Sequence, residues 1–290
     1  TGLIRIWDYP GDFTTLAYLE DLITILGLNK GDVKYPDLLA QYHMDNNWSD
    51  SSGNGYNGTP YNFTTSGFDD TNKIAGTHSG SFDGVNDYVR VSSSAVVANS
   101  PESAIEAWVY PTSFTCPSGY TARTIYSENA SGKTVFRPYI SCAGKAGFGI
   151  YRSDISGYWT AVESSETLSI NTWNHIVATL DATGMKIYVN GVLSATNASN
   201  NRPSTESIAE VSIGRINDSG GKDYFSGLID NLAIYNRSLP TEDILEHYNA
   251  GISDDRIPPF PASVNEIPSP TYSNLITLSG KKDSDASVRV

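Results

Sequence analysis

The feature that most constrains the fold of this chain is the pair Asn190-Gly191. A tight type I′ β-hairpin needs positive φ at both central residues, and Asn-Gly is the pair that adopts this conformation most readily. The pair lies within Met185–Leu193, which alternates apolar and polar residues, and Asn171–Asp181 shows the same alternation shortly before it. The sequence therefore predicts antiparallel β-strands here, and the alternation of Phe225–Tyr235 predicts a further strand.

Short alternating segments separated by Gly, Ser and Asn turns continue along the chain. The predicted strands are Leu38–Met44, Tyr88–Val91, Ala104–Tyr110, Thr124–Glu128, Phe136–Ser141, Gly147–Arg152, Tyr158–Val162, His175–Leu180, Lys186–Val189, Val192–Thr196, Val211–Gly214 and Gly227–Tyr235. One late helix is predicted at Thr241–Ala250, with Thr241 as its cap and Gly251 at its end. Many short strands and one helix indicate an all-β sandwich.

The charge of the chain excludes several classes of partner. The formal net charge is −13 and the pI is about 4.6. Such a surface repels phosphate backbones and anionic lipid headgroups, so we expect no nucleic acid partner. It favours divalent cations or neutral ligands instead. No apolar run is long enough to span a bilayer, so direct membrane insertion is not expected either.

The two cysteines, Cys116 and Cys142, are the only ones in the sequence. A redox pair and a metal-binding pair are the functional alternatives, but no His or second Cys pair stands at zinc-like spacing. We favour a structural disulfide, which indicates an oxidising compartment and hence a secreted or cell-surface protein.

Three regions differ in composition. Residues 1–35 combine a short strand with an apolar stripe at helical spacing, which predicts a β-α appendage or the tail of an upstream domain. Residues 36–252 form the predicted sandwich. Residues 253–290 begin with a proline-rich linker and continue into segments that resemble the first strands of a bacterial Ig-like domain. The expected protein is therefore multidomain, and neighbouring domains of the same polypeptide are expected partners.

The order of several segments points to a known family. These segments are Asp50–Thr59, Gly80–Val91, Ser103–Pro111, Asn171–Asp181, Gly227–Leu239 and Glu242–Tyr248. In this order and spacing the chain resembles the laminin-G-like (type 3) domain of the concanavalin A-like lectin/glucanase superfamily, over roughly residues 36–251. The resemblance implies a concanavalin A-like jelly-roll β-sandwich with a short terminal helix.

The resemblance also implies a calcium site. Ca²⁺ prefers clustered carboxylate, amide and carbonyl oxygens, and the segment Asp45–Asn57 is dense in them. In the family, calcium commonly lies where this loop meets the last strand. The matching carboxylates are Asp50 and Asp230, with Asn54 and Asn57 as further ligands. Asx-turns are the alternative reading of such residues, and it is the one we favour for Asp83 and Asp87.

An enzymatic function is not expected. The superfamily includes glucanases, but their alternation of three acids on one strand is absent. The spacing of Glu163 and Glu166 does not suit two carboxylates on one strand face, and Glu106 lies in a segment that is structural in non-enzymatic relatives. The four histidines, His43, His78, His175 and His247, are scattered through different motifs, and no catalytic triad is visible locally.

Aromatic side chains near loops and strand ends predict a binding function. A sugar is held by an aromatic platform with a few oriented polar groups. Tyr158 and Trp159 are the preferred pair, with Tyr151 and the loop residue Trp48 as additional candidates. The sequence thus favours a calcium-stabilised adhesion or glycan-recognition module whose partner is a glycan or a cell-surface protein. The competing interpretation is a structural or protein-interaction module of a filament, stalk or phage-like appendage.

Overall fold

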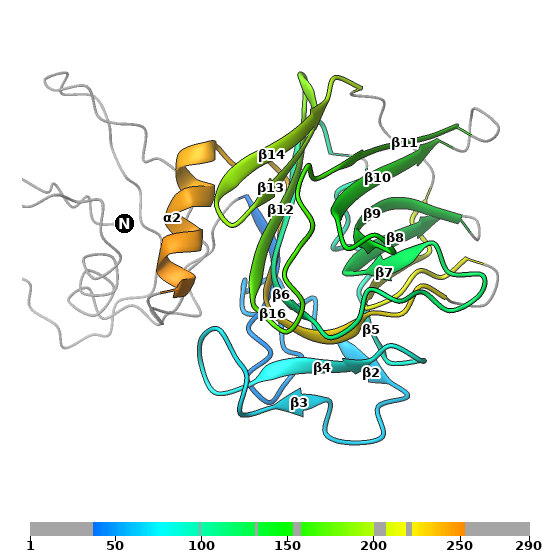
Figure 1. Cartoon of the computed structure of the whole chain (residues 1–290), viewed down its shortest axis with the longest axis vertical. Coiled ribbons are helices and arrows are strands. Elements are labelled where there is room, and N and C mark those ends of the chain that lie inside the picture. Colours follow the sequence, from blue (N-terminus) through cyan, green and yellow to red (C-terminus); the bar gives the residue numbers. More distant parts are fainter. Residues whose placement is uncertain are drawn as a thin grey trace, which may run out of the picture.

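Two antiparallel β-sheets packed face to face make up the protein in a computed structural model (Figure 1). The structure describes residues 37–98, 100–130, 133–152, 158–199, 207–218 and 222–252. Within these residues each sheet contains eight strands. The predicted all-β sandwich is therefore confirmed. The predicted N-terminal β-α appendage, the proline-rich linker and the Ig-like strands lie outside the described residues.

The first sheet has the strand order β14-β13-β12-β6-β16-β4-β3, and β1 also pairs with β16. Its strands are β1 (Leu38–Tyr42), β3 (Phe68–Asp69), β4 (Ser79–Asp83), β6 (Ser103–Pro111), β12 (Asn174–Asp181), β13 (Gly184–Val189), β14 (Val192–Asn197) and β16 (Ser226–Tyr235). Neighbours that are distant in sequence, such as β6 and β16, pair at the centre of this sheet.

The second sheet has the order β11-β10-β9-β8-β15-β5-β2, and β7 pairs with β9. Its strands are β2 (Thr59–Tyr61), β5 (Tyr88–Val91), β7 (Ala122–Thr124), β8 (Tyr126–Ala130), β9 (Lys133–Ser141), β10 (Ala146–Arg152), β11 (Tyr158–Glu163) and β15 (Glu210–Ile213). Four of its members, β8, β9, β10 and β11, are neighbours both in sequence and in the sheet.

The hairpin predicted from Asn190-Gly191 is present. The two residues have φ values of 51° and 79°, and Val189 pairs directly with Val192 across the turn. Every strand predicted from the sequence has a counterpart in the structure. Four strands were not predicted: β2, β3, β4 and β7. The Asx-turn predicted for Asp83 is also observed, because its Oδ1 accepts hydrogen bonds from the Val85 and Asn86 amides at 2.8 and 3.1 Å.

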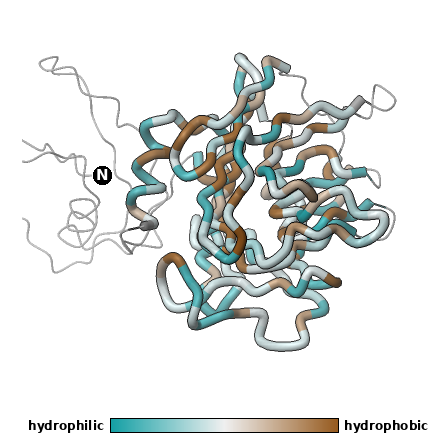
Figure 2. Tube along the Cα trace, viewed as in Figure 1, coloured by the Kyte–Doolittle hydropathy of each residue, from teal (hydrophilic) through white to brown (hydrophobic). Residues whose placement is uncertain are grey.

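The hydrophobic core fills the space between the two sheets. Apolar and polar positions alternate along many strands (Figure 2), so each sheet turns one face inward. Among the largest fully buried side chains of this core are Tyr42, Tyr126, Phe136, Phe148, Phe225 and Ile150. Apolar burial of this extent is the main stabilising term for a sandwich.

Helix α2 (Thr241–Ile252) covers the outer face of the first sheet. Its Ile244 belongs to a second, smaller apolar cluster with Val177 and Tyr235 on that sheet. The Tyr248 ring stacks on Trp108, with ring centres 5.6 Å apart. Figure 1 shows α2 on the opposite side of the molecule from β9, β10 and β11. In the described part of the chain, no helix covers the outer face of the second sheet.

A buried charged cluster fixes α2 to the sheet. Glu106 on β6 accepts hydrogen bonds from Nε2 of His175 on β12 at 2.7 Å and from Nδ1 of His247 on α2 at 2.9 Å. Burial acts to raise the pKa of Glu106, but the two histidines hold it well below its usual range. Burial likewise opposes protonation of His247, yet the Glu106 carboxylate raises its pKa. Because this cluster is enclosed in the protein, we assign it a structural role.

Among the described residues, no helix has the length and apolar character to cross a membrane.

Replacing Glu106 by Gln should destabilise the fold strongly. Both histidines would lose their ionic partner in a buried site, which costs about 3 kcal/mol or more when one member of a buried pair is removed. Urea unfolding measures this change in the free energy of unfolding. The exposed Glu102→Gln is the control and should change stability by less than about 0.5 kcal/mol. Equal stability of the two variants would contradict a structural role for the Glu106 cluster.

Candidate ligand cleft and candidate metal site

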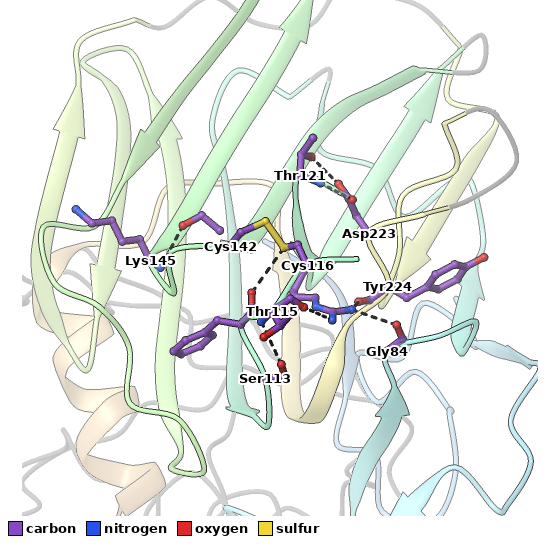
Figure 3. The surroundings of a disulfide bond; sticks show 12 residues. Gly84, Ser113, Thr115, Cys116, Thr121, Cys142, Lys145, Asp223 and Tyr224 are labelled. Atoms are coloured by element: carbon purple, nitrogen blue, oxygen red, sulfur yellow. Dashed lines mark hydrogen bonds between the residues drawn. A yellow bond between two sulfur atoms is a disulfide. The ribbon is translucent and has the colours of Figure 1, made fainter. Parts of the chain in front are cut away.

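A disulfide and a set of hydrogen bonds fix the loops at one end of the second sheet (Figure 3). Cys116, in the loop between β6 and β7, is bonded to Cys142, which directly follows β9. The predicted structural disulfide is thus present. Nearby, the buried Arg123 donates to the carbonyl oxygens of Gly84 and Tyr224 at 3.1 and 2.9 Å. It also donates to the carbonyl oxygen of Thr115, so Arg123 on β7 ties three separate loops to one another.

Asp223 extends this framework to the sheet surface. Its side chain is fully buried and accepts hydrogen bonds from the Thr121 amide and hydroxyl at 2.8 and 2.7 Å. The same carboxylate pairs with Nη2 of Arg137 on β9 at 2.7 Å. Burial lowers the pKa of Arg137, although Asp223 opposes the shift. Because an Arg–carboxylate pair fixes geometry as well as charge, the guanidinium is held in place.

Arg137 lies at an open cleft of about 340 Å³ on the outer face of the second sheet. Among the described residues, the cleft is lined by Lys133, Thr134, Arg137, Tyr151, Trp159, Asp218 and Lys222. The lining side chains point outward because successive residues of a strand face opposite sides of the sheet. Phe148 and Ile150 of β10 are fully buried in the core, so Gly149 and Tyr151 face outward.

Trp159 forms the apolar wall of the cleft. It pairs directly with Tyr151 across β10 and β11, and its side chain is 43% exposed. The indole lies over Gly149, where a Cβ atom would overlap the ring. Lys133 completes this wall, because its Nζ lies 2.9 Å from the Tyr151 hydroxyl and 4.9 Å from the centre of the Tyr151 ring. An aromatic surface with polar groups at its edge is the arrangement that binds sugars.

The four aromatic residues that were predicted to contact a ligand lie in different surroundings. Trp159 and Tyr151 lie together in the cleft. Tyr158 belongs to β11, but its side chain is outside the described part of the structure. Trp48 was predicted to be exposed, and this is wrong. It is only 7% exposed and its ring lies 4.7 Å from that of Phe68, within an aromatic cluster of the core.

Asp50 organises its own loop. One carboxylate oxygen accepts from the Gln41 and Ser52 amides at 3.0 and 2.9 Å, and the other accepts from the Tyr56 amide and Ser52 hydroxyl, both at 2.9 Å. These bonds satisfy both oxygens without a metal. The predicted pairing of Asp50 with Asp230 is therefore not what the structure presents.

The two predicted amide ligands in this loop also have structural partners. The Asn57 Oδ1 accepts from the Asp50 amide at 2.9 Å. The Asn54 side chain donates to the carbonyl oxygens of Leu38 and Leu39, both at 3.0 Å. Their amide groups hold the loop against β1.

Asp230 has a different neighbour, Asp45. It lies on β16 beside a β-bulge, where Asn231 has a φ of 47°. Its Oδ2 accepts from the Ile74 amide at 2.9 Å, while its buried Oδ1 has no partner among the described residues. Burial raises the pKa of Asp230 to about 8, and the Asp45 carboxylate adds to the shift. A buried carboxylate with one unsatisfied oxygen is an unfavourable arrangement unless another group compensates it.

A small pocket of about 40 Å³ lies beside Asp45 and beside Asn231, the residue that follows Asp230. Its described lining consists of His43, Asp45, Ala75, Gly76 and Asn231. Asp45 accepts from the Thr77 and His78 amides; although burial opposes this, the hydrogen bonds lower the pKa of Asp45. An ionised carboxylate therefore faces a pocket large enough for one ion or water molecule.

The oxygen set of this pocket fits calcium better than a transition metal. No cluster of three or more His, Cys, Asp or Glu side chains suited to a metal occurs in the described residues. Ca²⁺, however, accepts amide and backbone oxygens beside carboxylates. Asp45 and Asn231 supply such groups to the pocket, although the Asn231 Oδ1 also lies 2.8 Å from Nδ1 of His43. The neighbouring Asp230 has an unsatisfied Oδ1 that a bound cation would compensate. Asp45 and Asn231 were missed as candidates, although Asp45 directly follows the first predicted strand.

The sandwich and its aromatic cleft define a lectin-like β-sandwich protein. A laminin G-like family model, described as the concanavalin A-like lectin/glucanases superfamily, matches residues 83–245. The chain belongs to this superfamily. A comparison with curated protein sequences gave no match.

Solved structures share the fold at low sequence identity. One is domain 4 of AbnA, an extracellular arabinanase from Geobacillus stearothermophilus, in complex with arabinotriose. Its sequence is 21% identical and its TM-score is 0.57. The match covers 72% of this chain and 97% of that domain. Another is the binding domain of Paraclostridial Mosquitocidal Protein 1, with 16% identity and a TM-score of 0.56 over 74% of this chain.

A third structure is the receptor-binding domain of botulinum neurotoxin mosaic serotype C/D, with a tetraethylene glycol molecule and a sulfate ion bound. It has 16% identity and a TM-score of 0.55 over 77% of this chain. The chain spans about half the length of the two toxin domains, 52% in each case.

The raised pKa of Asp230 predicts a pH dependence of stability in the absence of divalent cations. Between the ordinary Asp pKa of about 4 and the folded value of about 8, the folded state retains a proton that the unfolded state loses. Asp230 therefore lowers stability as pH rises through this window, by up to roughly 1.4 kcal/mol per pH unit. Urea unfolding in EDTA at several pH values measures the slope.

Asp230→Asn should make this slope shallower, because Asn does not titrate. Glu128, whose burial raises its pKa to about 7, contributes in the same direction in both proteins. Identical slopes for the wild type and the variant would contradict the assignment to Asp230.

Proposed function

We propose that this domain is a non-catalytic glycan-recognition module of a larger secreted or cell-surface protein, and that Ca²⁺ stabilises it. The observation that carries the proposal is the half-exposed indole of Trp159, which lies over Gly149 in an open cleft. The exposed part of this indole leaves apolar surface in contact with water. A pyranose ring would remove this apolar surface from water.

The other cleft residues suit the hydroxyl groups of a sugar. Asp218 is an acceptor whose Oδ1 is oriented by the Thr134 hydroxyl at 2.8 Å, and Lys133 and Lys222 are donors. Convergent donors and acceptors beside one aromatic ring provide orientation, while the ring provides affinity.

Two proteins of the same fold support a glycan as the ligand. The arabinanase domain was solved with arabinotriose bound. Cell entry of botulinum neurotoxin type C, another protein of similar structure, depends on interaction with two ganglioside molecules. Other proteins with this kind of β-sandwich therefore bind saccharides.

The cleft supports binding without catalysis. Glycoside hydrolysis uses two carboxyl groups on either side of the scissile bond. Asp218 is the one carboxylate among the described lining residues. Glu106, the acid closest to two histidines, is enclosed beneath α2 on the other sheet.

The proposed secretion of the protein and the proposed calcium site are consistent with each other. A disulfide persists in oxidising compartments, where Ca²⁺ is also abundant enough to occupy weak sites. Asp45, Asp230 and Asn231 would hold the ion, and the ion would supply the positive charge that the carboxylate pair lacks. The surrounding segments 74–78 and 43–46 would then be fixed to β16.

A protein-interaction module is the competing function, and one observation favours it. Val192 and Leu193 at the edge strand β14 are 62% and 43% exposed, and Leu245 on the adjacent helix is 45% exposed. Exposed apolar side chains that lie together favour contact with another protein. Leu193 pairs with Tyr188 of the helix-side cluster, so Leu193 and Leu245 lie on the helix side of the first sheet, whereas Val192 lies at the turn opposite Val189. The cleft lies on the outer face of the second sheet, so variants of the two surfaces separate the two functions.

Trp159→Ala should abolish or strongly weaken glycan binding. Loss of a stacked aromatic ring costs about 1 kcal/mol or more, which corresponds to at least about fivefold in affinity. The measurement is binding to a broad glycan array, in Ca²⁺ and after chelation. Leu245→Ala is the matched control, because it removes an exposed apolar side chain from the helix side. Binding by the wild type that Trp159→Ala leaves intact would place the site elsewhere, and silence of the wild type would favour the protein-interaction function.

Calcium should raise the thermal stability of the domain at pH 8. The ion would relieve the repulsion between Asp45 and Asp230, so millimolar CaCl₂ should increase Tm by several degrees relative to EDTA. Asp45→Asn and Asp230→Asn should lose this response. Asp50→Asn should lower Tm in both buffers but retain the response, because Asp50 holds the loop. A response lost in Asp50→Asn alone would favour the site predicted from the sequence.

A further inference from the structure

The cleft has a charge opposite to that of the chain as a whole. The chain carries a net charge of −13. The described lining of the cleft nevertheless contains three cationic side chains, those of Lys133, Arg137 and Lys222, against one carboxylate, Asp218. A cationic depression in an acidic surface concentrates anions locally and repels them elsewhere. The neutral ligand expected from the composition is therefore not what this cleft favours.

Arg137 is the fixed part of this positive surface. Its residue is only 5% exposed, and Nη2 is held by the buried Asp223. Its Nε has no hydrogen-bond partner among the described residues. This Nε is enclosed, and Nη1 donates to the Thr121 hydroxyl at 3.4 Å, so Arg137 contributes a fixed positive charge to the wall of the cleft that it lines. Because the guanidinium is already positioned, binding would cost little conformational entropy.

The two lysines add charge around this fixed group. Lys133 lies at the aromatic wall, with its ammonium group against Tyr151. Lys222 enters from the segment before β16, where it forms an isolated β-bridge with Ile216. The cationic groups thus come from two distant parts of the chain, at the same cleft as the Trp159 indole.

Two carboxylates reduce this charge but do not cancel it. Asp223 lies behind Arg137, fully buried and engaged by Thr121 as well. Asp218 accepts from the Thr134 hydroxyl at 2.8 Å and from the Asn129 side chain at 3.3 Å. Counting Asp223 with the lining residues still leaves one net positive charge at the cleft.

We propose that the ligand of this cleft is an anionic saccharide. One sugar ring would stack on Trp159, and its carboxylate or sulfate group would be bound by Arg137, Lys133 and Lys222. This inference rests on the proposed glycan-binding function and narrows it to one chemical class. Charge-assisted hydrogen bonds to such a group are stronger than those to neutral hydroxyls, so the acidic substituent would determine specificity.

The test compares acidic glycans with their neutral counterparts. The array contains uronate oligosaccharides and their carboxyl-reduced forms, sialylated glycans and their desialylated forms, and sulfated glycans with their unsulfated forms. Pairs that bind are then titrated by calorimetry at low and high NaCl. We expect the acidic member to bind at least about tenfold more tightly, which corresponds to one charge-assisted hydrogen bond. The preference should shrink in high salt.

Variants assign the preference to the cleft. Lys222→Gln and Lys133→Gln should reduce the affinity for the acidic member several-fold while changing the neutral member little. Lys73→Gln, on the loop between β3 and β4, is the control and should change neither. Trp159→Ala should weaken both members. Arg137 is not varied in the first series because it also pairs with a buried carboxylate.

The outcomes separate this inference from the function on which it rests. Equal binding of acidic and neutral members, or an acidic preference that both lysine variants retain, would overturn the anionic ligand and leave glycan recognition standing. Acidic binding of undiminished affinity in Trp159→Ala would overturn the inference, because no sugar ring would then stack on this indole. Binding to no member of the array would overturn both. The carboxylate and sulfate pairs distinguish which anion is recognised.

Discussion

The burial of Glu106 determines which face of this sandwich remains open. A carboxylate on the outer surface of a sheet is ordinarily solvated, but here two histidines and a helix enclose it. The part of the first sheet around β6, β12 and β16 is therefore buried on both sides, between the core and α2. The described part of the second sheet has no equivalent cover, so its outward residues are available for recognition.

Much of this fold could be predicted from the sequence. The period-2 alternation and the Asn190-Gly191 turn indicate the strands because they reflect local physics. Three of the missed strands, β2, β3 and β7, have only two or three residues, so no periodicity exists to detect. The fourth, β4, has five residues but contains Gly and Ser at most of its positions. These strands are fixed by pairing with β5, β4, β9 and β16, which sequence alone does not reveal. Trp48 shows the same limit, because exposure depends on which rings surround it.

The candidate sites were predicted less well than the strands, for a physical reason. Asp50 and Asp45 are both acidic residues in one polar loop, and five residues separate them. Asp50 is satisfied by its own loop and by β1, whereas Asp45 acts on Asp230, which is distant in sequence and lies beside a β-bulge. The positive charge of the cleft was equally hidden, because Arg137 and Lys222 come together only through the sheet and the Asp223 pair.

The Arg137–Asp223 pair has a consequence for how the molecule is built and used. It joins positions 86 residues apart, and the aromatic wall comes from a separate hairpin between them. The lining residues extend from Lys133 to Lys222, so no short peptide contains the whole cleft. Recognition is therefore a property of the completed sandwich, and a chain that has lost its tertiary structure loses its ligand at the same moment. Occupancy of the cleft would in turn hold β9, β10 and β11 to the segments that carry Asp218 and Lys222.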